Sequence, residues 1–277
     1  MKEKAYGKIN LALDVCGVLD NGYHEIRSVM LPIDFYDLLQ INIASEDNYY
    51  CNWSYITYNE HNSIYKMINL LKQRYSIVDH HYIKILKSIP IQAGLGGGTA
   101  DAAATLRLFE KMYDLKLSKQ EIRDICVNVG ADVLFNYYNI PALISGIGDI
   151  IEPIEVKNDY YVLLVKPHSG ISTIKAYENL NLDDCIHPDI DKLLIALKNG
   201  DSIDGLLGNS LQVVATKLNN DICDVLRVLD DVGARNVLMS GSGSTVFCIS
   251  ENKDEIIDLY DRIKHLNYYV RFSKILK

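Results

Sequence analysis

Four glycines within five positions form the segment of this chain with the clearest capacity for chemistry. They are Gly94, Gly96, Gly97 and Gly98, inside the segment 90–100, and a helix-favouring segment follows them. Successive glycines let backbone N–H groups turn toward one point, and a helix adds the positive end of its dipole. The segment therefore predicts an anion-binding loop. A glycine-rich turn without a ligand is the alternative, and it is disfavoured because glycine is entropically costly where nothing approaches the backbone.

The two common phosphate-binding motifs do not account for this loop. The only Gly-Lys pair is Gly7-Lys8, which is followed by Ile9, so the chain contains no G-x-x-x-x-G-K-[ST] segment. Residues 94–99 also fail to match G-x-G-x-x-G in a dinucleotide-binding context. The loop is therefore predicted to be a phosphate loop of another class.

A carboxylate, Asp132, is the second candidate for chemistry. It stands between an apolar helical pattern and an apolar run, and burial of an unpartnered carboxylate is expensive. We expect it to have a partner, and Lys8 in the first predicted strand is the basic residue that we assign to it. Each residue also has an ordinary interpretation, since an Asp after a helix is commonly a cap or turn residue and an isolated strand Lys is commonly solvated.

Aromatic and hydroxyl side chains at two further places could recognise a small ligand. Tyr23 and His24 are adjacent in a turn-like context, and such a pair can stack on a base and hydrogen-bond its edge. Thr173 and Tyr177 are four residues apart and share a face if 172–179 is helical. A plain surface turn and ordinary core packing are the alternatives.

Alternating and helical patterns predict the elements that must position these residues. Apolar and polar residues alternate in a β-rich opening, and helical spacing begins after Asn62, which is suited to capping. The predicted strands are 8–15, 39–43, 81–87, 160–166, 236–239, 245–249 and 268–275. The predicted helices begin near 62, 99, 118, 173, 189, 211, 222 and 253. We therefore expect an α+β fold with two domains, 1–155 and 156–277, the closing strand being able to pack on the first domain.

Composition excludes several classes of protein. The 277 residues are 48% hydrophobic and carry a net charge of -8, the wrong sign for coating nucleic acid or anionic lipid. Apolar stretches fall well short of the roughly 20 residues that cross a bilayer. Six scattered cysteines without a C-x-x-C pair predict buried reduced thiols, and seven histidines without ligand spacing predict no structural metal. We place the protein in the cytoplasm, without nucleic-acid or membrane partners; the oligomeric state stays open.

Taken together, these segments resemble the galactokinase, homoserine kinase, mevalonate kinase and phosphomevalonate kinase superfamily nearly end to end. The matching segments are 7–11, 21–25, 89–98, 130–133, 170–173 and 238–247. Gly22-Tyr23-His24 together with the triple glycine is similar to the members that act on a cytidine diphosphate-linked methylerythritol. The resemblance implies a two-domain α+β enzyme that binds ATP over the loop 90–100 and its small-molecule substrate between the lobes.

The resemblance also implies roles for individual residues. Asp132 corresponds to the base that takes the proton from the substrate's 2-hydroxyl, and Lys8 to its ion-pair partner. Tyr23, His24 and Tyr177 correspond to a cytosine pocket. The other assignments are Asn10 and Thr173 near the diphosphate and sugar, Gly241, Ser242 and Gly243 in a loop supporting the substrate side, Lys87 beside the adenine, and Pro90, Ile91, Gln92, Ala93, Gly94, Leu95, Gly96, Gly97, Gly98, Thr99 and Ala100 around the ATP phosphates.

The implied reaction is ATP-dependent phosphorylation in the methylerythritol phosphate route to isoprenoid precursors. Mg²⁺ is expected to bridge the ATP phosphates, held by them and by water, so that a dedicated ligand cluster is not needed. Two alternatives are a superfamily kinase of another small alcohol and a catalytically idle nucleotide-binding regulator on the same fold. The chain departs from the family pattern at Thr99-Ala100, where Ser-Ser is usual, at Leu134, where proline is frequent, and at 136–139, which replaces a more glycine-rich turn.

Overall fold

The computed structural model describes residues 1–20 and 22–277, so Asn21 of the segment 21–25 lies outside the described residues. The chain forms two compact units, and the segments of the two units alternate along the sequence. The first contains Met1–Gly7, Phe35–Pro90 and Gly96–Asn139, and the second contains Lys8–Asp34, Ile91–Leu95 and Ile140–Lys277. Because the segments of the units are interleaved, they provide no test of a division at one position, and the domain boundary at residue 155 stays a prediction.

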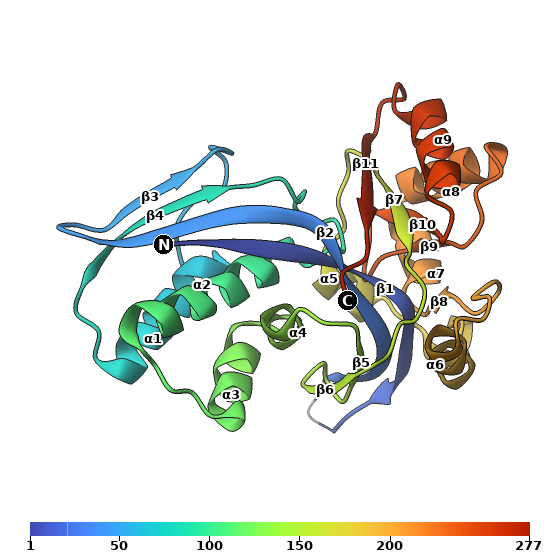
Figure 1. The fold of residues 1–277 in the computed structure, drawn as a ribbon. Helices are drawn as coiled ribbons and strands as arrows, with labels where there is room; N and C mark the ends of the chain where they lie inside the picture. The colour runs from blue at the N-terminus through green and yellow to red at the C-terminus, as the bar shows by residue number, and fades with distance from the viewer. Residues whose placement is uncertain (21) are drawn as a thin grey trace. The chain divides into compact units, whose positions relative to one another are not determined.

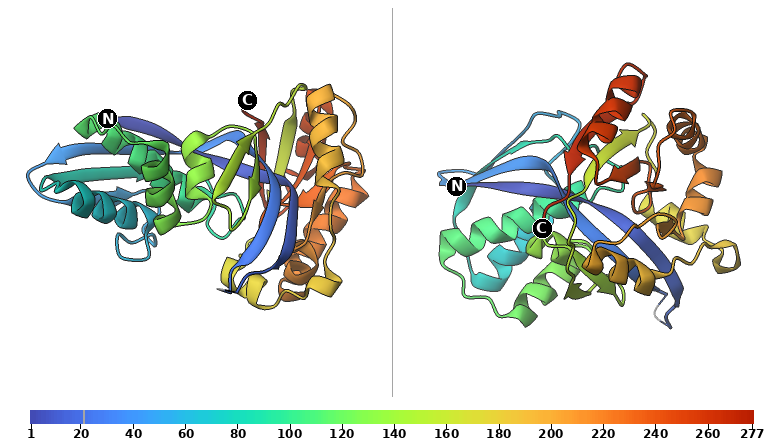
Figure 2. Two further views of the ribbon diagram at one scale, coloured as in Figure 1. Left: turned by 90° about the horizontal axis from the view of Figure 1, so that it is seen from below. Right: turned by 45° about the vertical axis from the view of Figure 1, so that its right-hand side comes forward.

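Two long neighbouring strands run through both units. β1 (Lys2–Val18) and β2 (His24–Ala44) lie next to each other in one sheet, and Figure 2 shows them side by side. Both strands are buried on alternate or successive positions along their middle parts, because apolar residues recur there. Each strand therefore contributes one segment to each unit.

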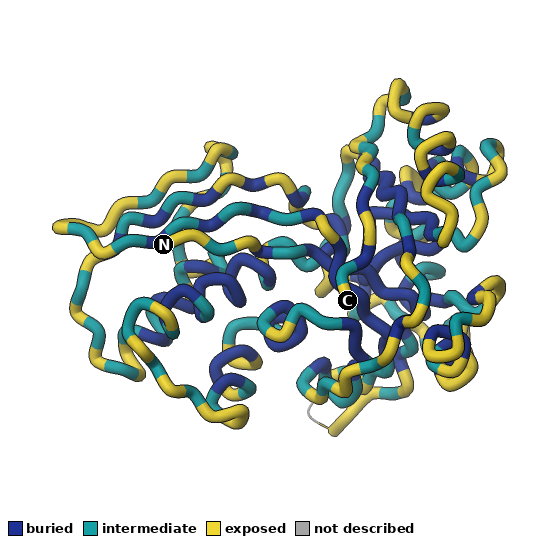
Figure 3. Tube along the Cα trace, viewed as in Figure 1, coloured by how far each residue is buried: buried dark blue, intermediate teal, exposed yellow. Residues whose placement is uncertain are grey.

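The first unit is a sheet with helices on one face (Figure 1). Its strands follow the order β3 (Asn48–Cys51), β4 (His80–Leu86), β2 and β1, with β3 parallel and β2 antiparallel to β4. Its helices are α1 (Ser63–Tyr75), α2 (Gly97–Tyr113), α3 (Lys119–Val129) and α4 (Val133–Tyr138). Figure 3 shows that α2 is buried along most of its length. Its alanines 100 and 102–104 are small, which allows the neighbouring helices to approach closely.

The helix boundaries of this unit follow from local capping. Asn62 accepts hydrogen bonds from the N–H groups of Ile64 and Tyr65 and so begins α1. Ser118 and Glu121 form a reciprocal capping box at the start of α3. Both signals were available from the sequence, and both predictions are confirmed.

The second unit combines the other halves of β1 and β2 with an antiparallel sheet. That sheet has the order β11 (Tyr269–Lys274), β7 (Tyr161–Lys166), β10 (Val246–Ser250) and β9 (Val237–Met239). The helices α7 (Gln212–Leu218), α8 (Asn220–Asp231) and α9 (Lys253–Ile263) share an apolar core with it. The remaining elements are β5 (Ala142–Ser145), β6 (Ile150–Pro153), β8 (Gly208–Asn209), α5 (Thr173–Glu178), α6 (Ile190–Asn199) and the 3₁₀ turn η1 (Leu182–Asp184).

The α+β class is confirmed, and all the predicted strands and helices occur. β1 and β2 extend far beyond the predicted strands 8–15 and 39–43, whereas the other predicted elements differ only by small shifts at their ends. The short elements β3, β5, β6, β8 and α4 were not predicted. The cysteines are free, but only Cys126 and Cys248 are buried, so the prediction of buried thiols was wrong for the other four. Near the C-terminus, Ile275 forms an isolated antiparallel β-bridge with Ile33 of β2.

Candidate active site

The first half of the glycine loop, residues 91–95, packs in the second unit against the loop 240–245. Three hydrogen bonds join them: from the Ser244 N–H to the Gln92 carbonyl (3.3 Å), from the Thr245 N–H to the Ala93 carbonyl (3.2 Å), and from the Ser240 hydroxyl to the Gly94 carbonyl (3.0 Å). Gly94 has a φ of +70°, and a Cβ there would lie 1.9 Å from the Ser240 carbonyl oxygen. Only glycine permits this approach, so the two glycine-bearing loops form one structure.

The second half of the glycine loop begins α2 in the first unit. Gly96 has a φ of +69° and precedes the helix, which starts at Gly97 rather than at the predicted Thr99. The first N–H groups of a helix have no intrahelical partner, and here glycines carry them. A Cβ on Gly97 would lie 2.9 Å from Cγ2 of Ile89, so close packing also favours glycine there. This geometry can bind an anion at the start of α2.

Two of the departures from the family pattern contact each other. The Thr99 hydroxyl lies 2.9 Å from both the Gly96 carbonyl and Oδ1 of Asn136, whose amide nitrogen donates to the Tyr6 carbonyl at 3.1 Å. Asn136 belongs to α4, and half-buried Asp132 stands immediately before that helix. Thr99 and Asn136 therefore link the start of α2 to the helix that directly follows Asp132.

Lys8 and Asn10 lie together beneath the second glycine loop in the second unit. Nζ of Lys8 donates to Oδ1 of Asn10 at 2.7 Å, and the Lys8 N–H donates to the Leu95 carbonyl at 3.0 Å. A Cβ on Gly241 would lie 3.1 Å from Nζ of Lys8 and 3.5 Å from Oδ1 of Asn10. Asp132 belongs to the first unit, so its pairing with Lys8 stays a prediction.

The residues assigned to the substrate side also meet within the second unit. The rings of His24 and Tyr177 have centroids 4.9 Å apart, and the hydroxyls of Thr173 and Ser242 are 2.8 Å apart. Tyr23 is 60% exposed beside His24. The tilted rings of His24 and Tyr177 offer an aromatic surface on which a flat base can stack.

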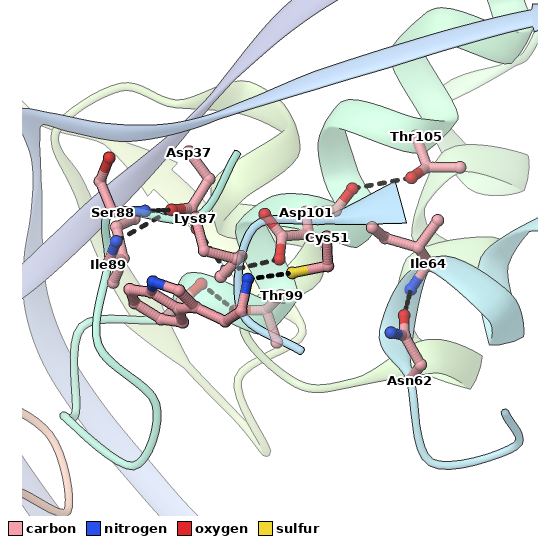
Figure 4. A network of polar contacts seen from close by, with 12 residues as sticks. Asp37, Cys51, Asn62, Ile64, Lys87, Ser88, Ile89, Thr99, Asp101 and Thr105 are labelled. Atoms are coloured by element: carbon pink, nitrogen blue, oxygen red, sulfur yellow. Dashed lines mark hydrogen bonds and ion pairs between the residues drawn. The ribbon is translucent and has the colours of Figure 1, made fainter. Parts of the chain in front are cut away.

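Lys87 takes part in a buried ion cluster of the first unit that no sequence pattern indicated (Figure 4). Its Nζ contacts Oδ2 of Asp101 at 2.6 Å and also a carboxylate oxygen of Asp37, whose other oxygen accepts the Ile89 N–H at 2.9 Å. Burial alone lowers the pKa of Lys87, but Asp101 and Asp37 outweigh it and raise that pKa. Burial raises the pKa of Asp101, and among residues 1–20 and 22–277 Oδ1 of Asp101 has no hydrogen-bond partner.

This cluster ties α2 to β2, which contains Asp37, and to the residue that directly follows β4, Lys87. Asp37 and Asp101 are 50 and 14 residues from Lys87, and no local pattern links them. The ammonium of Lys87 is ion-paired with Asp37 and Asp101. Its position beside an adenine stays a prediction.

Comparison with known proteins places the chain in a family. The profile of the GHMP kinases N terminal domain matches residues 62–146, and that of the GHMP kinases C terminal domain matches residues 181–268. The chain belongs to the GHMP kinase family. It is 37% identical to a 4-diphosphocytidyl-2-C-methyl-D-erythritol kinase of Bacillus cytotoxicus, over 94% of this chain and 92% of the relative. It is 36% identical to the kinase of the same name from Clostridium beijerinckii, over 95% and 96%.

Solved structures of GHMP kinases share the fold. A crystal structure of 4-(cytidine 5'-diphospho)-2C-methyl-D-erythritol kinase matches with a TM-score of 0.84 and 25% identity, over the whole of both chains. Streptococcus pneumoniae phosphomevalonate kinase, solved with phosphomevalonate and AMPPNP, matches with a TM-score of 0.72 and 14% identity, over 100% of both chains. At that identity the second likeness shows the fold alone.

The described part of this GHMP kinase, residues 1–20 and 22–277, shows two further features. No three His, Cys, Asp or Glu side chains gather in it where a metal ion could be held. No helix in the same residues combines the length and the apolar character that a bilayer crossing requires.

Proposed function

We propose that this GHMP kinase transfers the γ-phosphoryl group of ATP to the 2-hydroxyl of 4-diphosphocytidyl-2-C-methyl-D-erythritol. The observation that carries the proposal is the pair of interlocked glycine loops with Lys8 and Asn10 beneath Gly241. The substrate is supported by the paired rings of His24 and Tyr177 and by the relatives of that name. A cytoplasmic location stays a prediction of the sequence.

The chemistry needs positioned charge more than covalent assistance. In phosphoryl transfer an enzyme mainly aligns the groups and stabilises negative charge on the equatorial oxygens. Backbone N–H groups at the start of α2 suit the ATP phosphates, and the ammonium of Lys8 suits the developing charge. Asp132 is assigned the removal of the acceptor's proton. Because the described residues hold no cluster of metal-binding side chains, Mg²⁺ would be held chiefly by phosphate oxygens and water.

The decisive experiment is direct. Purified protein is incubated with ATP, Mg²⁺ and 4-diphosphocytidyl-2-C-methyl-D-erythritol, and the product is analysed by mass and by NMR for a phosphate on the 2-hydroxyl. The uridyl analogue is the matched control. Equal turnover of both substrates would reject the cytosine pocket. ATP binding without product from either substrate would favour the two alternatives, a kinase of another alcohol or the idle regulator.

Asp132→Asn tests the assigned base. General-base assistance accelerates a reaction by a factor of about 10² to 10⁴, so kcat should decrease by a factor in that range. The Kd for ATP should stay unchanged. Asp124→Asn is the control, because Asp124 is an exposed carboxylate in the same unit. A wild-type kcat in Asp132→Asn would remove Asp132 from the mechanism.

A further inference from the structure

The ammonium of Lys8 is the end of a buried chain of three hydrogen bonds that begins at Ser28. The Ser28 hydroxyl donates to the Ala12 carbonyl at 2.7 Å, Nδ2 of Asn10 donates to Oγ of Ser28 at 2.8 Å, and Nζ of Lys8 donates to Oδ1 of Asn10 at 2.7 Å. Ser28 is completely buried, and Lys8 and Asn10 are each 3% exposed. All four residues belong to the second unit, Ser28 on β2 and the others on alternate positions of β1.

The Ala12 carbonyl determines the direction of the whole chain. A carbonyl oxygen only accepts, so the single hydroxyl hydrogen of Ser28 is used there. Oγ of Ser28 can then only accept from the Asn10 side chain, which turns the NH₂ end of that amide toward Ser28. The oxygen end of the same amide consequently faces Lys8, whose ammonium has donors and no acceptor.

The opposite amide orientation would be costly. It would place the NH₂ group of Asn10 against the ammonium of Lys8, and two buried donors would face each other. The backbone of Gly241 lies beside this ammonium, because a Cβ on Gly241 would be 3.1 Å from Nζ of Lys8. The orientation of one amide therefore affects where the charge of Lys8 stands.

We propose that Ser28 is a positioning residue for phosphoryl transfer. By fixing which end of the Asn10 amide faces Lys8, it holds the Lys8 ammonium where the transferred phosphoryl group needs positive charge; this inference rests on the proposed function. Ser28 reaches Lys8 through the Asn10 amide, so its effect on Lys8 depends on the Asn10 side chain. The same geometry assigns Asn10 the orientation of Lys8 in addition to its predicted place near the substrate.

A double-mutant cycle on kcat tests the dependence. Ser28→Ala removes the acceptor of the Asn10 amide, and we expect kcat to fall about tenfold, the equivalent of one charge-assisted hydrogen bond, with the KM for ATP within twofold of wild type. In an Asn10→Ala background, the same Ser28→Ala change should alter kcat less than twofold. A full additional loss in that background, or an unchanged kcat in Ser28→Ala alone, would overturn the proposal.

A measurement that needs no turnover accompanies the cycle. Reductive methylation of Lys8, followed by mass spectrometry of the folded protein, should be several-fold faster in Ser28→Ala than in wild type. Ser273→Ala is the control, because Ser273 is another buried serine of the second unit whose hydroxyl donates to a backbone carbonyl. Thermal melting of both variants shows whether they fold.

The two measurements separate the two hypotheses. If wild type made no phosphorylated product, the proposed function would fail while the methylation rates would still decide the position of Lys8. If wild type were active and both kcat and the Lys8 methylation rate were unaffected by Ser28→Ala, the positioning role alone would be rejected. A methylation rate equally raised by Ser273→Ala would also count against it.

Discussion

Gly94 occupies a position that no other residue can take without moving the loop beside it. Two independent effects oppose a side chain at this position. The φ of Gly94 is +70°, and a Cβ would lie 1.9 Å from the Ser240 carbonyl oxygen. Gly205 separates the two effects, because its φ is +73° but a Cβ there would lie within 4 Å of no atom in the described part of the chain, residues 1–20 and 22–277. The pair therefore distinguishes backbone strain from the contact between the two glycine loops.

We expect Gly94→Ala to lower the free energy of unfolding more than Gly205→Ala does. Left-handed backbone costs a non-glycine residue about 1–2 kcal/mol, which applies to both variants. Overpacking against Ser240 adds about 1–3 kcal/mol in Gly94→Ala alone. Urea unfolding of both variants measures the difference, and equal losses would show that the loops separate freely.

The sequence was informative about single residues where the signal is local. The density of glycines predicted an anion-binding loop, and the binding of an anion there stays a prediction. At Gly94 the structure shows a second reason for glycine, the close approach of the loop 240–245. Ser28 carried no signal, because its importance arises from the pairing of two strands and from the direction of a hydroxyl hydrogen. Neither the pairing of the strands nor the direction of the hydroxyl hydrogen can be predicted from a sequence pattern.

At the scale of elements, the ion cluster of Lys87 connects a helix to a sheet. Asp101 lies in α2, whereas Asp37 and Lys87 lie on or just after strands, so two carboxylates share one ammonium in a buried place. Desolvation raises the pKa of Asp101, assisted by Asp37 and opposed by Lys87. The folded state consequently holds a proton on Asp101 more tightly than the unfolded chain does.

This difference predicts a pH dependence for Asp101→Asn. A carboxyl group with a raised folded pKa stabilises the fold fully below its unfolded pKa, and that stability is lost as pH rises toward the folded pKa. Wild type should therefore lose stability relative to Asp101→Asn above about pH 4, by up to about 1.4 kcal/mol per pH unit. Urea unfolding between about pH 4.5 and pH 7.5 checks this, with Asp124→Asn, at an exposed carboxylate of the same unit, as the matched control. Parallel curves for wild type and Asp101→Asn would contradict it.

Elements with local end signals were predicted well, and elements made by distant pairing were not. Asn62 and Ser118 begin α1 and α3 through side chains within three residues of the helix they cap. The two residues of β8 become a strand only because they pair in parallel with Ala12 and Leu13 of β1. Such a strand has no pattern of its own, because its partner lies almost 200 residues away along the chain.

At the scale of the whole molecule, an acidic protein is proposed to bind two polyanions. With a net charge of -8, its long-range field repels them, so binding depends on nearby backbone dipoles and single lysines. Salt screens the long-range repulsion as much as any local attraction. We therefore expect kcat/KM for ATP to change less than about twofold between about 50 and 300 mM KCl at fixed free Mg²⁺. A fall of more than about tenfold would indicate a broad cationic surface instead.

The interleaving of the two units has a consequence for synthesis on the ribosome. The first unit is complete once Asn139 has emerged, whereas Lys8–Asp34 of the second must wait for residues 140–277. Leu13 and Val15 belong to an apolar core whose other members, such as Leu163 and Val225, are made more than 140 residues later. Nascent chains therefore carry uncovered apolar strand segments beside an already folded neighbour, which makes the late-completed half the place where chaperone binding or misassembly should concentrate.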